Sequence, residues 1–504
     1  MILIMKNLFT YIKRITLFAL IAMASSCSDD FLEVPVKGKL TAETTSDYEL
    51  LLKNEDFYRQ TGGIRVGLAP DVCLLSEFAQ SFVNPEKAQA FQWTEDVYLS
   101  DENMTIVQNH TKNLYAYNKI IEEVPNSLEG TEDEKRRILA EALTGRAWIN
   151  FDLIDYFSKP YNASTASTDL AFPIITEKEI TQTFFEQSTV EEMYQHIIND
   201  LTTAMPDLPI LTQRLRPSKG GAMALLGKVY MAKGEYQKAI DFIDDAFDEF
   251  ANGAIPAGLY DYNVDLGVAI PSNPILGASS IQPIDHNENP FGRYYDNPDG
   301  GFLQETFLTP ETIALYDPTD PRKLFFAGNQ FFSLPSFPVY PAGVFKKRGS
   351  GNTPSRAANI PDLYLLRAEA KARLDDLAGA VTDVEFFRTH RLPPAGTFVI
   401  TSFSPFAFAI SQGPEVPTAI ASDKNQLLNF IMDERIREFC GTGIEWSTTR
   451  RIFSDPIFSG RTYVHNEYAE DGTINATYTL TEDRLVLRYN ESFMNQNPNF
   501  INNP

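Results

Sequence analysis

Few residues in this sequence have the spacing of a catalytic or metal site. The chain contains no Walker loop, no H-E-x-x-H, no nucleophile elbow and no paired Cys-x-x-Cys. Its five histidines are scattered without metal-ligand spacing, which favours hydrogen-bonded or solvated rings over ligands. They are His110, His196, His286, His390 and His465. We therefore expect no metal and no cofactor.

The acidic residues leave two weaker possibilities. Asp261, Asn263 and Asp265 have the spacing of a calcium loop, but Leu266 and Ser272 stand where such a loop needs Gly and Glu. We interpret this stretch as an ordinary loop and leave open whether a cation binds there. Paired carboxylates for glycoside hydrolysis are defined by their positions in space, so the sequence leaves them open among 67 acidic residues.

Aromatic side chains grouped with polar ones are the more informative pattern. Flat rings stack on the C–H faces of sugars, while planar polar groups bind the hydroxyls. Three such groups fall in irregular segments and are the predicted ligand-binding candidates: Trp93, Tyr98 and Asn103; Phe291, Arg293, Tyr294, Tyr295 and Asp296; Phe337 and Tyr340. We expect Trp148 and Trp446 in the core, which leaves Trp93 as the best candidate for display. Plain packing of any one ring is the competing interpretation.

The elements that must position these groups are predicted to be helical. Residues 217–250 have the spacing of a tetratricopeptide hairpin. Gly227 and Ala239 allow two helices to approach closely, and Gly234 suits the left-handed turn between them. Such a hairpin buries its apolar face only against further helical pairs. The sequence therefore predicts a stack of hairpins.

Further helical patterns follow along the chain. Thr131 with Glu134, and Thr189 with Glu192, form capping boxes for two more helices. A second hairpin is predicted over 362–391, although Arg367 stands where the first unit has Leu226. The last clear helix covers 428–439, and we expect the tail to end in polar turns. Between these repeats, about 252–360, prolines, glycines and aromatic residues predict a large irregular excursion. The predicted fold is α-dominated with little β-structure, in one domain spanning 27–504.

The N-terminus has the pattern of an export signal. Basic residues precede the apolar run 15–24, which is too short to span a bilayer, and Ser25, Ser26 and Cys27 follow. A cysteine at this place resembles the lipid-attachment site of bacterial lipoproteins, so we expect residues 1–26 to be removed and Cys27 acylated. Ordinary cleavage, with Cys27 left as a thiol, is the alternative.

The net charge indicates which partners to exclude, and the cysteines leave two structural alternatives. The net charge of −24 opposes binding to phosphate backbones, so we expect no nucleic-acid partner. Besides Cys27 the chain has Cys73 and Cys440, which either pair in an oxidising compartment or lie buried as small apolar side chains.

Several stretches, taken together and in order, resemble the SusD/RagB family of surface lipoproteins that partner TonB-dependent transporters. They are CSDDFLE at 27–33, LAEALTGRAWINFDLIDYF at 139–157, VEEMYQHIINDLTTAMPDLP at 190–209, the hairpin at 217–250, LYLLRAEAKARLDDLAGAVTDVEFFRTHR at 363–391 and IMDERIREFCGTGIEW at 431–446. The chain departs from the family at 441–446, where a Glu-Gly-Arg run is usual. This departure puts the local packing in question more than the function.

The resemblance implies a non-catalytic protein, lipid-anchored at the outer surface of the outer membrane. It implies an oligosaccharide or polysaccharide ligand, held largely by the irregular loops and delivered to a SusC-like TonB-dependent transporter. The acidic residues after Cys27 resemble the signal for surface export. Three alternatives stay open: the same architecture with peptide or another nutrient as cargo, a tetratricopeptide scaffold for protein partners only, and a surface hydrolase.

Overall fold

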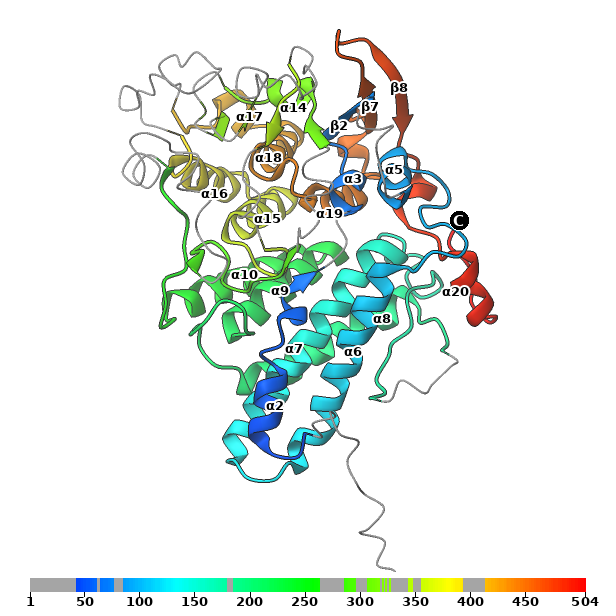
Figure 1. Ribbon diagram of the computed structural model, residues 1–504. Coiled ribbons are helices and arrows are strands. Elements are labelled where there is room, and N and C mark those ends of the chain that lie inside the picture. Colours follow the sequence, from blue (N-terminus) through cyan, green and yellow to red (C-terminus); the bar gives the residue numbers. More distant parts are fainter. Residues whose placement is uncertain are drawn as a thin grey trace, which may run out of the picture.

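The protein is a stack of antiparallel helices with a small sheet at one end (Figure 1). The computed structural model describes residues 42–60, 64–76, 85–178, 185–262, 285–295, 306–317, 320, 322–323, 326–327, 343–347, 355–392 and 413–504. The main helices are α6 (Thr105–Glu123), α7 (Glu132–Phe157), α8 (Val190–Ala204), α9 (Lys219–Lys233), α10 (Tyr236–Ala251), α15 (Ile360–Arg373), α16 (Leu377–Thr389), α18 (Lys424–Phe439) and α19 (Ile444–Ile452). From α6 to α10 each helix packs on the next, α10 then packs on α15, and α15 packs on both α16 and α18. The predicted α-dominated architecture is confirmed.

The first predicted hairpin is α9 and α10. Gly234 ends α9 in the left-handed conformation, with φ of 74°, as expected for a residue without a Cβ. At Gly227 the helices approach so closely that a Cβ would lie 2.7 Å from Ile243 Cγ1. Ala239 and Ile243 are fully buried in this seam. The spacing of small and apolar residues over 217–250 therefore reflects the close packing of α9 on α10.

The second predicted hairpin is α15 and α16. It has Arg367 at the position where the first hairpin has the apolar Leu226. The Arg367 guanidinium donates hydrogen bonds to Asp383 of α16 and to Asp244 of α10, and it lies 4.9 Å from the centre of the Phe247 ring. A charged side chain thus replaces the apolar seam residue of the first repeat, with its partners supplied by both neighbouring helices.

Helix α7 is the central element of the N-terminal half. Thr131 and Glu134 form the predicted capping box, and Thr189 with Glu192 forms that of α8. From Ile138 to Phe157 nearly every side chain of α7 is buried, because α6, α8 and α9 surround it. Charged residues in this stretch must therefore find partners inside the protein.

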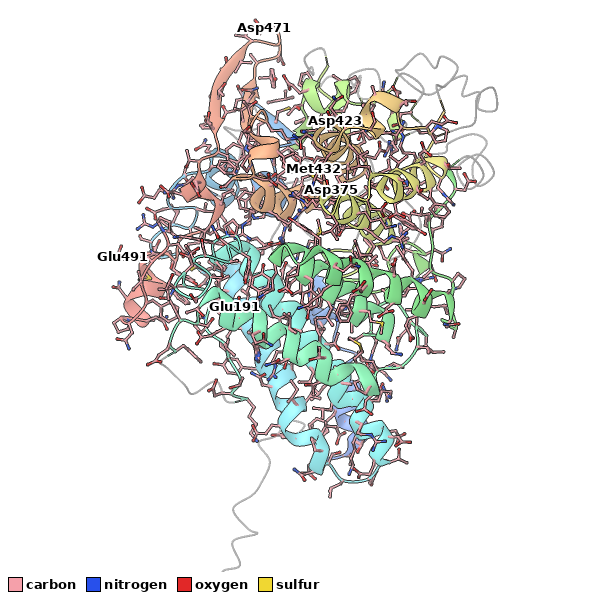
Figure 2. All side chains as sticks on the ribbon, turned by 180° about the vertical axis from the view of Figure 1, so that it is seen from behind. Glu191, Asp375, Asp423, Met432, Asp471 and Glu491 are labelled. Carbon is pink, nitrogen blue, oxygen red and sulfur yellow. The ribbon has the colours of Figure 1, made fainter. Side chains whose placement is uncertain are left out.

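A mixed sheet closes one end of the stack. Its strands are β4 (Thr306–Leu308), β2 (Val72–Leu75), β7 (Val464–Tyr468) and β8 (Ile474–Thr479), in that order, with β2 and β7 parallel and the other pairs antiparallel. The hairpin of β7 and β8 projects from the body with Asp471 at its tip (Figure 2). The interpretation of 428–439 as the last clear helix was wrong, because α19, this hairpin and α20 (Glu491–Gln496) follow.

Shorter elements complete the described chain. Helical ones are α2 (Thr45–Leu51), η2 (Glu55–Phe57), α3 (Ile64–Leu68), α5 (Pro85–Gln92), η3 (Val124–Asn126), η4 (Met205–Asp207), α14 (Pro310–Ala314), α17 (Thr418–Ala421), η9 (Pro456–Phe458) and η10 (Glu482–Leu485). Two-stranded pairs are β1 (Arg59–Gln60) with β3 (Tyr294–Tyr295), and β5 (Phe326–Ala327) with β6 (Lys346–Lys347). Within the described ranges, no helix combines the length and apolarity needed to cross a membrane.

Of the two alternatives for the cysteines, burial holds. Cys73 of β2 lies opposite Phe307 of β4, and Cys440 lies 3.1 Å from the Tyr316 hydroxyl. Both thiols are buried, and they do not form a disulfide with each other. Cys27 and the predicted signal segment lie outside the described residues, so their roles stay predictions.

Candidate functional site

The first predicted aromatic group is not displayed. Trp93 is 5% exposed, its indole N–H donates to the Leu68 carbonyl at 3.0 Å, and its ring stacks on His465 with 3.7 Å between centroids. Tyr98 is also buried, and Asn103 is exposed. Display of Trp93 and Tyr98 was therefore a wrong expectation. The physical reason is that α5 packs on α3, which draws the residues after α5 into the core.

The second group is buried as far as the structure describes its side chains. Arg293 lies over the Phe291 ring at 4.3 Å and donates to the Leu215 carbonyl, and Tyr294 is in strand β3 against β1. All three side chains are in the interior, so their display was also a wrong expectation. Tyr295 continues β3. Asp296, Phe337 and Tyr340 lie outside the described residues and stay predicted ligand contacts.

A cavity of about 650 Å³ lies elsewhere, between α7, α9, α15 and α19. Its lining comes from segments far apart in the sequence. Its charged members are Arg65, Asp152, Asp155, Lys159, Asp169, Lys228, Lys233, Arg356, Asp362, Arg373, Arg435, Arg450, Arg451, Asp455, Glu482 and Asp483. None of the predicted ligand-binding residues whose side chains the structure describes lines it. Because it combines a ligand-sized volume with convergent polar groups, it is the candidate site.

A buried group among the charged lining residues, called here the cavity floor, consists within the described chain of five cationic side chains and three carboxylates. The cations are Arg65, Lys228, Arg356, Arg435 and Arg450, and the carboxylates are Asp152, Asp155 and Asp362. All eight are largely buried. They come from α3, α7, α9, the segment before α15, α15 itself, α18 and α19.

Each carboxylate of the cavity floor is shared by at least two cations. Asp152 accepts from Arg65 at 3.0 Å and from Arg356 at 2.6 Å, and it also contacts His110 Nε2 at 2.7 Å. Burial alone would raise the pKa of Asp152, but Arg356, His110 and Arg65 together hold that pKa well below its ordinary value. The carboxylate is therefore ionised at every physiological pH.

The other two carboxylates are held in the same way. Asp155 is paired with Arg65 and, at 2.9 Å, with Arg450. Asp362 lies 2.9 Å from Lys228 and 2.8 Å from Arg435. Burial opposes ionisation of Asp362, but these two cations lower its pKa to about 2.

Aromatic rings and a lysine form one side of the rim. Tyr161 and Tyr194 meet edge to face with 5.1 Å between centroids, and Lys233 Nζ lies 4.4 Å from the centre of the Tyr161 ring. Tyr161 donates to Glu191 at 2.6 Å, which fixes the ring, and it is half-buried. The rim thus offers a positioned flat ring beside the charged interior.

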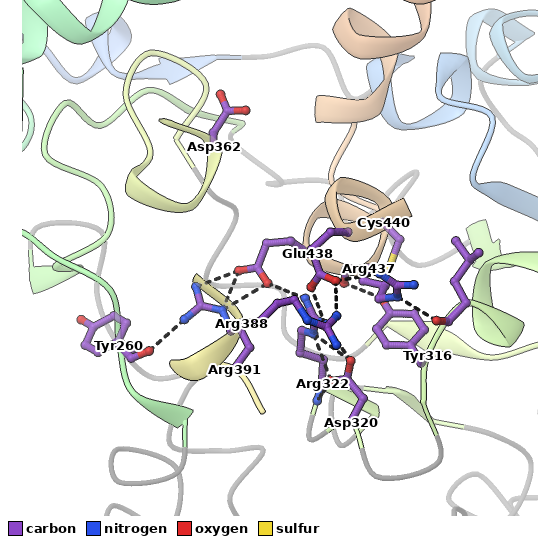
Figure 3. Close-up of polar contacts among 12 residues, drawn as sticks. Tyr260, Tyr316, Asp320, Arg322, Asp362, Arg388, Arg391, Arg437, Glu438 and Cys440 are labelled. Carbon is purple, nitrogen blue, oxygen red and sulfur yellow. Dashed lines mark hydrogen bonds and ion pairs between the residues drawn. The ribbon is translucent and has the colours of Figure 1, made fainter. Parts of the chain in front are cut away.

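A second buried ionic network anchors the excursion to the helical stack (Figure 3). It consists of Glu288, Asp320, Arg322, Arg388, Arg391, Glu434, Arg437 and Glu438, and is called here the α16–α18 network. Arg322 of the excursion donates to Glu434 at 2.8 Å and to Glu438 at 3.2 Å. Its four cations and four carboxylates balance. Asp317 also lies 4.0 Å from Arg388 at the edge of the network, so among the described residues no cation is left in excess.

Sequence reasoning missed the cavity, although one signal pointed to it. Asp152 and Asp155 stand among apolar residues in the buried second half of α7, and Glu434 and Arg435 stand between the apolar residues of α18. A charge without a polar face must meet partners or a ligand inside the fold. Among the residues that the structure describes, no cluster of His, Cys, Asp and Glu suits a metal ion.

Comparison with known proteins gives one family and one fold. Residues 69–231 match the model of the SusD-like family described as "Starch-binding associating with outer membrane". A SusD superfamily protein from Bacteroides thetaiotaomicron VPI-5482 superposes with a TM-score of 0.67 at 19% identity, covering 92% of this chain and 100% of the other. A putative sugar binding protein from Bacteroides vulgatus ATCC 8482 gives a TM-score of 0.62 at 18% identity, covering 92% and 99%.

A laminarin binding SusD-like protein gives a TM-score of 0.59 at 16% identity, covering 92% of this chain and 100% of the other. A search of curated proteins finds no match. At these identities the solved structures establish a shared fold over nearly the whole chain, and the family model adds a sequence match within it.

Proposed function

We propose that the chain is a member of the SusD/RagB-like family, a surface lipoprotein that binds a glycan without cleaving it and delivers it to a TonB-dependent outer-membrane transporter. The observation that carries the proposal is the match of residues 69–231 to a family described as starch-binding and associated with the outer membrane. The solved relatives described as sugar binding and laminarin binding support a glycan as the ligand class.

The cavity supplies a place for a sugar. Its volume of about 650 Å³ falls within the range of roughly 300–1,000 Å³ typical of ligand pockets. The Tyr161 ring at the rim suits the C–H face of a pyranose, and the charged groups inside suit hydroxyls. We assign the cavity to one unit of the glycan, and we retain the predicted residues Asp296, Phe337 and Tyr340 for contacts along the polymer.

The chemistry of the cavity floor supports binding over hydrolysis. Glycoside cleavage needs a carboxylic acid that stays protonated near neutral pH and donates its proton to the leaving oxygen. Asp152, Asp155 and Asp362 have lowered pKa values, because burial is outweighed by the paired cations. None of the three is available as that general acid.

Calorimetry on the mature chain, residues 27–504, tests the proposal with soluble polysaccharides and peptides as ligands. We expect a polysaccharide to bind and chromatography to show no released product. Tyr161→Ala is expected to weaken binding about two- to tenfold, the loss of ~0.5–1.5 kcal/mol from one stacked ring. Phe386→Ala is the control, because Phe386 is exposed on α16 and does not line the cavity.

Other results would assign another function. Released sugars would indicate a hydrolase, and binding of peptides alone would indicate a different cargo. Binding of neither, together with capture of a protein partner, would indicate a scaffold. Co-purification with a large outer-membrane barrel tests the transporter partnership separately.

A further inference from the structure

Among the residues that the structure describes, the cavity floor carries more positive than negative charge. Its five cations face three carboxylates, and every one of these carboxylates is already shared. The α16–α18 network, buried to a similar degree, balances four against four. This contrast is marked in a chain of net charge −24. Because a buried charge is costly without a counter-charge, the excess at the cavity floor calls for an anion.

The other charges near the cavity floor do not cancel this excess. Glu445 acts electrostatically on Arg435, but burial raises the pKa of its carboxyl to about 8, so Glu445 is protonated and neutral at pH 7. Arg373 and Arg451 are paired with Glu369 and Asp455, so that group is balanced. At the rim, Lys159 pairs with Asp169, and Lys233 pairs with Glu191. Glu482 and Asp483 also lie at the rim, but they are exposed to solvent, which screens them from the interior.

Two buried donors at the cavity have no acceptor. Trp148 Nε1 and Arg435 Nη1 make no hydrogen bond within the described part of the chain, and both side chains line the cavity at 2% exposure. Indole and guanidinium nitrogens only donate, so a ligand that satisfies them must supply acceptor atoms. Arg435 is already held by Asp362 and by the Thr448 hydroxyl, which positions its remaining N–H.

We propose that the cavity binds the carboxylate of an acidic sugar, a uronic acid unit of the glycan. A carboxylate is planar, accepts two hydrogen bonds at once from a guanidinium fork, and supplies the missing negative charge. The Tyr161 ring at the rim then faces the apolar side of the sugar ring. This inference rests on the proposed function, because it specifies the sugar that the same cavity accepts.

Calorimetry on the mature chain tests the inference with galacturonic acid oligomers, with galactose oligomers of equal length and with sodium sulfate. We expect the acidic oligomers to bind at least about tenfold more tightly than the neutral ones, as one charge-assisted hydrogen bond implies. Trp148→Phe keeps most of the ring and removes the N–H, so it is expected to weaken binding of the acidic oligomers about tenfold.

A second variant tests the same site independently, in case Trp148→Phe does not fold. Lys228→Gln removes one positive charge from the cavity floor and is expected to weaken acidic oligomers more than neutral ones. Lys112→Gln is the matched control, because Lys112 is exposed on α6 and pairs with Asp56 away from the cavity. Thermal melting of each variant establishes that it is folded.

Several outcomes would overturn the inference. Equal affinity for acidic and neutral oligomers, or acidic binding that both variants leave unchanged, would remove the carboxylate from the cavity. Sulfate binding as tightly as the oligomers would show an anion site without sugar selectivity. Binding of neutral oligomers alone would refute the acidic ligand while the proposed function stands, whereas binding of no glycan in a wider screen would refute both.

Discussion

Replacing Glu445 by glutamine is expected to stabilise the protein at neutral pH. Glu445 lies on α19 at 4% exposure, and its Oε1 has no hydrogen-bond donor within the described chain. Burial raises the pKa of its carboxyl to about 8, although Arg435 opposes the shift, while Asp71 and Asp362 add to it. The native protein therefore holds Glu445 protonated at pH 7, where the unfolded chain would ionise it.

The magnitude follows from linkage between protonation and folding. Between the ordinary pKa of 4.5 and the raised value of about 8, the folded state binds one proton more than the unfolded state. The free energy of unfolding therefore falls as pH rises, by ~1.36 kcal/mol per pH unit. Between pH 4.5 and pH 7 the free energy of unfolding of the parent protein therefore falls by about 3 kcal/mol. The Glu445→Gln protein does not lose this stability, because glutamine cannot ionise.

The assay is urea denaturation of parent and Glu445→Gln proteins at pH 5, 7 and 8.5. The expected stability difference is below about 1 kcal/mol at pH 5, close to 3 kcal/mol at pH 7, and constant above pH 8. A variant less stable than the parent at pH 7 would refute the reasoning, since it would mean that an ionised Glu445 pairs with Arg435. A difference that does not change with pH would refute it as well.

Two further changes test the α16–α18 network and the N-terminus. Glu434 is fully buried and accepts hydrogen bonds from three arginines at 2.6–2.8 Å. Glu434→Gln is expected to lower the free energy of unfolding by about 3–5 kcal/mol, because it leaves buried cations uncompensated. Urea denaturation measures this change, and an unchanged midpoint would contradict it. Cys27→Ser is expected to release the protein from membranes on fractionation, because acylation of Cys27 is its proposed anchor. A membrane-bound variant would refute that anchor.

Local signals explain why the helices were predictable. The hairpin 217–250, the second hairpin over 362–391 and the capping boxes at Thr131 and Thr189 rest on contacts between residues close in the sequence. In each case the packing or hydrogen bond that the pattern requires is present. Arg367 shows the limit of such patterns, because its partner Asp244 belongs to the other repeat.

The sheet could not be predicted because its pairings are distant. Cys73 of β2 meets Phe307 of β4, and Leu74 meets Glu467 of β7, across hundreds of residues. These contacts also decide which aromatic residues are buried. Trp93 looked available for display in a polar stretch, yet His465 of β7 covers its ring. Exposure of a single ring therefore depends on strands that the sequence did not reveal.

The cavity extends this argument from packing to function. Buried charges were indicated by the sequence, since Asp152 stands among the apolar residues of the second half of helix α7 and Arg435 among those of helix α18. The sequence did not indicate how many of these charges meet in one place, because the residues of the cavity floor come from α3, α7, α9, α15, α18 and α19. The number of buried cations, compared with the number of buried carboxylates, distinguishes a structural network from a binding site. Where buried charges balance, as the four cations and four carboxylates of the α16–α18 network do, they hold elements together. Where cations exceed carboxylates and donors such as Trp148 Nε1 are unsatisfied within the described chain, the remaining partner is a ligand.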